Sequence, residues 1–170
     1  MILSLSLAAL IIIFLAWSFF TPDHIRIEHS VVIALDKDDL FEELKSLENQ
    51  SRLWGKKEEI EKVVIEGVDG QIGTEMIIVR NECKIRQKIS KIFDGERLES
   101  ELWISTFNGT NISYLQLEEI NQDSTMLTWG VLGNHNFPSD VLSRISGANE
   151  DLEDLMAEGL QAMKNELSTS

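Results

Sequence analysis

The stretch NISYLQLEEINQDSTMLTWGVLG, residues 111–133, decides the fold class of this 170-residue chain. Apolar and polar side chains alternate along both halves, and residues 121–123 between them form a typical turn sequence, Asn-Gln-Asp. A connection this short joins neighbouring antiparallel strands. We therefore predict a hairpin with strands over 111–120 and 124–133.

More strands are predicted before this hairpin. They are rich in β-branched residues, and Asp-Gly or Asn-Gly pairs at 69–70, 94–95 and 108–109 separate them. The predicted ranges are 62–68, 73–81, 85–93 and 97–107. Because their connections are short, we expect all these strands to form one antiparallel meander.

Helices are predicted on both sides of the meander. A first strand over 25–35 leads to Asp36, which can cap a helix over 37–47, and a short helical turn follows over 49–54. The clearest helical spacing is C-terminal, with Ser146 or Asn149 as its cap. Its apolar residues are Leu152, Leu155, Met156, Leu160, Met163 and Leu167. Gly159, in the middle of this helix, predicts a close approach to the sheet.

The first twenty residues contain no charged side chain. A helix of that length spans roughly 30 Å, the hydrocarbon thickness of a bilayer. We predict a transmembrane anchor over 1–20, a joint over 21–24 and one domain over 25–168. A cleaved signal peptide is the alternative, but no Lys or Arg precedes Arg26 and no small-residue cleavage site is present. The predicted location is therefore the membrane, with one N-terminal anchor. The charges flanking it do not fix the orientation, and they only lean towards a domain outside the cytoplasm.

The chain is strongly acidic. Its net charge is -14 and its pI is about 4.5, which argues against a nucleic-acid partner. Cys83 is the lone cysteine, so an intrachain disulfide and a thiolate metal cluster are excluded. The sequence does not indicate a protein partner.

This order of elements resembles the helix-grip fold of the START-like, Bet v 1-like superfamily. More closely, it is similar to the membrane-anchored bacterial proteins of the SRPBCC, polyketide cyclase/dehydrase type. The segments that carry the resemblance are IEHSVVI (27–33), the helix over 36–44, YLQLE (114–118), LTWGV (127–131) and the ending over 137–167. Relatives often have a Trp-rich loop after the first helices, and here only Trp54 remains of it.

The resemblance implies an α+β fold with a curved antiparallel sheet of about seven strands wrapped around a long C-terminal helix. One N-terminal transmembrane helix would precede it. The resemblance also implies a hydrophobic cavity between sheet and helix for lipids, sterols, polyketides or other apolar molecules.

Strand alternation and helical spacing select the side chains that would line this cavity. They are Trp54, Leu98, Leu102, Ile104, Leu115, Leu117, Leu127, Trp129, Val131, Met156, Leu160 and Met163. Phe137, Val141 and Leu142 would belong to a mobile lid over 134–147. For each single cavity residue a plain hydrophobic core is the favoured interpretation, and the fold as a whole carries the prediction of a cavity.

Opposite to the cavity, we expect a polar outer face. Trp103 alternates with the cavity candidates next to it, so it should be half-exposed. A basic cluster comprises Arg80, Lys84, Arg86, Lys88 and Lys91. The middle three share one strand face, which favours a solvated surface over an anion or headgroup site.

Patterns for catalysis and metal binding are weak. His24, His29 and His135 are scattered, and no metal-ligand spacing, nucleophile elbow or phosphate loop occurs. We predict no catalytic residue, no metal and no cofactor.

We expect a membrane-tethered module that binds an apolar small molecule or lipid without catalysis. Two alternatives stay open. A cyclase or dehydrase would need polar groups such as Gln87, Tyr114 or His135 to converge in the cavity, whereas the inner face is predicted to be almost wholly apolar. A cavity-free domain would instead serve as an envelope or stress interaction module.

Overall fold

A computed structural model describes residues 24–55, 57–80, 83–105, 110–134 and 148–167 of the chain. In this part of the chain, seven strands form one antiparallel sheet in the order β1-β7-β6-β5-β4-β3-β2. The strands are β1 His24–Ile33, β2 Ile60–Glu66, β3 Glu75–Arg80, β4 Cys83–Phe93, β5 Arg97–Ile104, β6 Asn111–Asn121 and β7 Ser124–Asn134. The predicted meander is confirmed.

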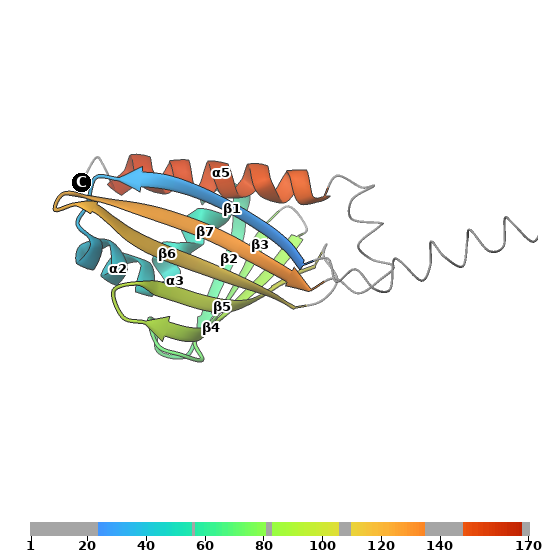
Figure 1. The fold of residues 1–170 in the computed structure, drawn as a ribbon. Coiled ribbons are helices and arrows are strands. Elements are labelled where there is room, and N and C mark those ends of the chain that lie inside the picture. Colours follow the sequence, from blue (N-terminus) through green and yellow to red (C-terminus); the bar gives the residue numbers. More distant parts are fainter. Residues whose placement is uncertain (1–23, 56, 81–82, 106–109, 135–147, 168–170) are drawn as a thin grey trace, which may run out of the picture.

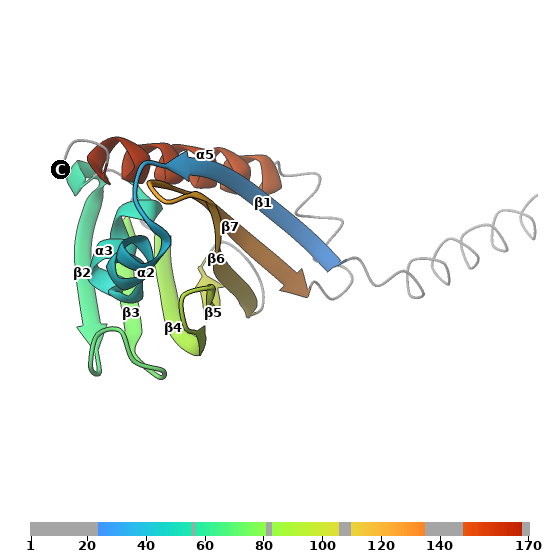
Figure 2. The same cartoon turned by 60° about the vertical axis from the view of Figure 1, so that its left-hand side comes forward.

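Helices lie on one side of this curved sheet. They are α2 Lys37–Lys45, α3 Leu47–Gln50 and α5 Ala148–Leu167, with short 3-10 helices η1 Ser51–Trp54 and η2 Lys57–Glu59. Figure 1 shows α5 running along the sheet beside β1, and Figure 2 shows α2 and α3 on the inner side of its curve. We call the sheet face toward these helices the inner face and the opposite one the outer face.

The helix predicted over 37–47 ends two residues early, at Lys45, and the short helical turn predicted over 49–54 is present as α3 and η1. Asp36 caps α2 as predicted, because its Oδ1 accepts hydrogen bonds from the backbone N–H groups of Asp38 and Asp39 at 2.9 and 3.0 Å. Ser46 then takes an extended conformation, and its hydroxyl caps α3. The carboxylate of Asp69 fixes this break, since it accepts from Ser46 Oγ at 2.6 Å and from the backbone N–H of Leu47 at 2.7 Å.

The C-terminal helix is confirmed, but one detail of its prediction is wrong. Of the two predicted caps, Asn149 is the second residue of α5 and Ser146 lies outside the described residues, so the cap stays a prediction. The close approach at Gly159 is to η1 and not to the sheet, because a Cβ atom there would overlap the carbonyl oxygen of Leu53. α5 therefore packs directly against the backbone of η1.

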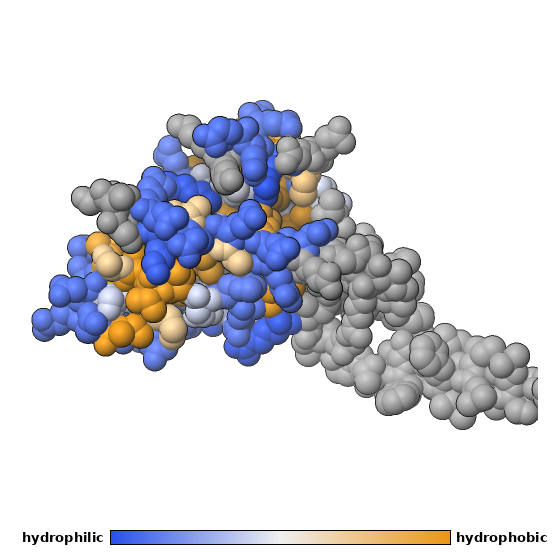
Figure 3. Space-filling view, turned by 90° about the horizontal axis from the view of Figure 1, so that it is seen from above, coloured by the Kyte–Doolittle hydropathy of each residue, from blue (hydrophilic) through white to orange (hydrophobic). Residues whose placement is uncertain are grey.

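Solvent-facing residues of α5 are mainly acidic or amide side chains. Seen from above the view of Figure 1, the molecule is hydrophilic over most of the visible face, with an apolar area toward the left (Figure 3). The buried side of α5 carries Leu152, Met156, Leu160 and Met163, which join the main core.

The membrane location predicted from the sequence needs correction. Within the described ranges, every helix is too short or too polar to span a bilayer. The anchor predicted over 1–20 lies outside those ranges, so the transmembrane helix of the predicted fold class is not found among the described residues. The domain boundaries remain a prediction.

Candidate functional site

The inner face and α5 together enclose the residues that the sequence selected as a cavity wall. Each of those side chains is at most 4 % exposed, and all of them belong to one continuous hydrophobic cluster. Their convergence on one interior space is therefore established. Their role as ligand contacts stays a prediction, and the lid residues Phe137, Val141 and Leu142 lie outside the described part of the chain.

A hydrogen-bonded amide network lies inside this cluster. The Trp54 Nε1–H donates to Gln87 Oε1 at 2.9 Å, and Gln87 Nε2 donates to Gln50 Oε1 at 2.6 Å and to Ser100 Oγ at 3.3 Å. Gln50 Nε2 donates in turn to the carbonyl of Leu44 at 2.6 Å. Burying these amides is tolerated because each has partners. The inner face is therefore less apolar than predicted.

A second polar contact holds the other buried tryptophan. Trp129 Nε1–H donates to Ser113 Oγ at 3.0 Å, and its ring meets that of Trp54 edge to face, with centroids 4.9 Å apart and planes at 86°. The network around Gln50 was not predictable from the sequence, because Gln50 lies in a four-residue helix that is too short to show a periodic pattern. Ser100 and Ser113 were detectable, since strand alternation places both on the inner face.

Of the two described polar groups proposed for an enzymatic cavity, Gln87 lies inside and Tyr114 does not. Tyr114 lies on the outer face, where its ring covers Gly130 and the Arg97 guanidinium carbon lies 3.9 Å from the ring centroid. A Cβ atom at Gly130 would overlap that ring, so the glycine makes room for it. His135 is outside the described residues, and His29, which pairs with Trp129 in the sheet register, is half-buried on the inner face.

Solved structures share this architecture at low sequence identity. A protein from Arthrobacter aurescens matches with a TM-score of 0.65 and 14% identity, over 89% of this chain and 93% of its own. Truncated norcoclaurine synthase from Thalictrum flavum matches with a TM-score of 0.63 and 13% identity, over 81% and 91%. The Aha1 dimer from Colwellia psychrerythraea matches with a TM-score of 0.58 and 15% identity, over 85% and 96%.

The chain therefore has the fold that these solved structures share, the helix-grip fold. No family profile and no curated protein sequence matches it. These comparisons concern the fold, and they do not identify the membrane-anchored subgroup named above.

The outer face of this helix-grip domain carries most of the predicted basic cluster. Lys84 and Arg86 are exposed, Lys88 is partly exposed beside them, and Trp103 is 38% exposed as expected. Arg80 does not join them. Its guanidinium turns toward η1 and η2, where it donates to the Trp54 carbonyl at 3.2 Å and pairs with Glu59 at 2.6 Å.

Glu99 gives the outer face a pH-dependent contribution to stability. Burial raises the pKa of this carboxyl, but the hydrogen bonds and charges of Lys91 and Arg97, at 3.1 and 2.8 Å, outweigh it and hold the pKa below the ordinary 4.5. A carboxyl whose pKa falls on folding stabilises the folded state above its unfolded pKa and loses that effect as the pH falls through the folded value.

We therefore expect Glu99→Gln to lower the free energy of unfolding near neutral pH and to have progressively less effect below about pH 4.5. Urea unfolding at a series of pH values measures this difference. Glu118→Gln, at an exposed position of β6 without an ion pair to any described residue, is the control. A loss that is independent of pH would show that the ion pairs do not act through ionisation of Glu99.

Proposed function

We propose that this domain binds an apolar or amphipathic small molecule, such as a lipid, between the inner face of the sheet and α5, and releases it unchanged. The observation that carries the proposal is the way α5 packs against the rest of the domain. Its backbone approaches β1 and η1 closely, and within the described residues it makes no comparable approach to the central strands β4, β5 and β6. Side chains fill the space between α5 and these central strands. A ligand can therefore replace side-chain contacts there without breaking backbone hydrogen bonds of the sheet.

The side chains in that space favour an adaptable apolar site. Met156 and Met163 point inward from α5, and unbranched thioether side chains adjust to irregular apolar shapes. The amides of Gln50 and Gln87 provide a polar point within apolar walls, an arrangement typical of small-molecule sites. One solved structure with this fold is a norcoclaurine synthase point mutant in complex with a transition state analogue.

Binding without catalysis is favoured by the chemistry of the buried groups. Of the residues described, the fully buried polar ones are Gln, Thr, Ser and Asn, besides Tyr114 on the outer face. The imidazole of His29 is only half-buried, on the edge strand β1. General acid–base chemistry needs a group that titrates near the working pH, and the fully buried Gln, Thr, Ser and Asn side chains do not.

N-phenyl-1-naphthylamine, a neutral dye that fluoresces in apolar surroundings, tests this proposal with the complete chain. We expect a saturable rise in fluorescence and a rise in melting temperature, because a ligand at about 100 times its Kd adds roughly 2.7 kcal/mol of stability to the folded state. A chain that neither binds the dye nor gains stability would contradict the proposal and favour the cavity-free interaction module.

Two adjacent residues of β5 provide a matched pair for locating the dye. Leu102 is fully buried on the inner face, whereas Trp103 is half-exposed on the outer face. Leu102→Ala should change the dye affinity several-fold, and Trp103→Ala should leave it unchanged. Met156→Leu, which conserves volume, is a second interior variant if Leu102→Ala proves unstable. Equal affinity in every variant would place the dye outside the interior.

A further inference from the structure

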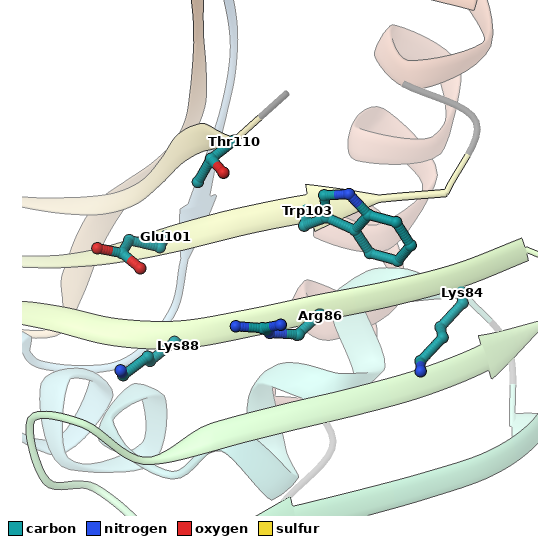
Figure 4. Close-up of a pocket in the computed structure, with 6 residues that line it drawn as sticks. All are labelled: Lys84, Arg86, Lys88, Glu101, Trp103 and Thr110. Atoms are coloured by element: carbon teal, nitrogen blue, oxygen red, sulfur yellow. The ribbon is translucent and has the colours of Figure 1, made fainter. Parts of the chain in front are cut away.

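The outer face contains a depression that the interior proposal does not use. It has a volume of about 240 Å³, smaller than the pockets of roughly 300–1,000 Å³ that hold drug-sized ligands. Lys84, Arg86, Lys88, Glu101, Trp103 and Thr110 line it. Figure 4 shows the three cations in a row on β4, with Trp103 and Glu101 facing them from the neighbouring strand β5.

The positive charge of this depression is concentrated at one end. Arg86 is paired with Glu75 at 3.0 Å, and Lys88 lies opposite Glu101 in the sheet register. Lys84 has Val79 opposite it in the register and hydrogen-bonds through its backbone to Ser105, so no carboxylate neutralises it among the described residues. In a chain of net charge -14, a lysine in a hollow without an ion pair to any described residue is a local attraction for an anion.

The same end presents an aromatic surface. Trp103 lies opposite Arg86 in the register and is 38% exposed, so part of its indole ring faces the hollow. An indole ring offers an incoming planar ring favourable offset or edge contacts. Thr110, which immediately precedes β6, adds a hydroxyl that can donate to an oxyanion.

We propose that this outer depression binds a small aromatic oxyanion, whose ring packs on Trp103 and whose carboxylate or phosphate is held by Lys84 and Arg86. Glu101, at the other end, repels a second negative group and so favours ligands with the charge on one side only. This site is separate from the interior, from which the sheet divides it, and it does not depend on the proposed function.

Isothermal titration calorimetry of the complete chain with 2-naphthoate tests the site. We expect 2-naphthoate to bind more tightly than neutral 2-naphthylmethanol, with an affinity that falls as salt is added. Lys84→Gln should weaken binding up to about fivefold, as for an exposed ion pair, and Trp103→Leu by about threefold to tenfold. Lys37→Gln removes the same charge on α2, far along the chain from the depression, and should leave the affinity unchanged.

Further probes separate the possible sources of binding. Inorganic phosphate and phenyl phosphate distinguish a site for the anion alone from one that also needs the ring. Saturating N-phenyl-1-naphthylamine should not displace 2-naphthoate if the two sites are distinct. Equal binding of 2-naphthoate and 2-naphthylmethanol, or wild-type affinity in both Lys84→Gln and Trp103→Leu, would overturn the proposal.

Discussion

Truncating Trp129 to alanine should lower the free energy of unfolding by about 3–5 kcal/mol, the usual cost of removing a large aromatic side chain from a core. Trp129 is 1 % exposed and packs edge to face on Trp54. The substitution removes that contact, leaves a cavity and deprives Ser113 of its hydrogen-bond donor. Urea unfolding followed by circular dichroism measures the loss.

Trp103→Ala is the matched control for this truncation. It removes the same side chain from the same sheet, but from the outer face, where the ring is 38% exposed, and it should cost clearly less stability than Trp129→Ala. A double-mutant cycle with Trp54→Ala isolates the ring contact, expected at about 0.5–1.5 kcal/mol. Equal losses for Trp129→Ala and Trp103→Ala would contradict the buried position of Trp129.

Replacing Gly159 by alanine should destabilise the protein even though alanine is the better helix former. The new Cβ atom would overlap the backbone carbonyl oxygen of Leu53, and that backbone cannot rotate away as a flexible side chain would. Overpacking costs typically about 1–3 kcal/mol, against a gain of up to about 1 kcal/mol in helix propensity. We expect a net loss from Gly159→Ala and a larger one from Gly159→Val, measured by thermal and urea unfolding.

A substitution at the exposed residue Ala157, two positions before Gly159, measures the effect of helix propensity alone. Ala157→Gly should lose about 1 kcal/mol, because only helix propensity changes there. If Gly159→Ala instead stabilised the chain by a similar amount, α5 would not be seated on the backbone of η1.

The spacing of residues along one strand or helix was sufficient to predict which face of that element each side chain occupies. Along β5, alternation placed Leu102 inside and Trp103 outside, and it did the same for the leucines of β6. The cap at Asp36 and the buried stripe of α5 also follow from short-range geometry, which a sequence displays directly.

Contacts between distant segments were not predictable in the same way. Tyr114 was a candidate for an inner polar group, yet it is buried on the outer face because Gly130, on the next strand, leaves space for its ring and Arg97 covers it. The split between α2 and α3 depends on Asp69, which lies in the loop after β2. No sequence pattern near Tyr114 indicates the role of Gly130, and none near Ser46 indicates the role of Asp69.

The sequence by itself determined the order of strands and helices, the face on which most apolar residues lie, and the excess of negative charge. Those properties depend on neighbours two to four residues apart, where the periods of strand and helix operate. Only the tertiary structure decided that Gln50, Gln87 and Ser100 meet around Trp54, and that Lys84 and Trp103 border one hollow. Such sites arise from side chains on separate elements, and their meeting depends on sheet register and curvature, which no single segment encodes.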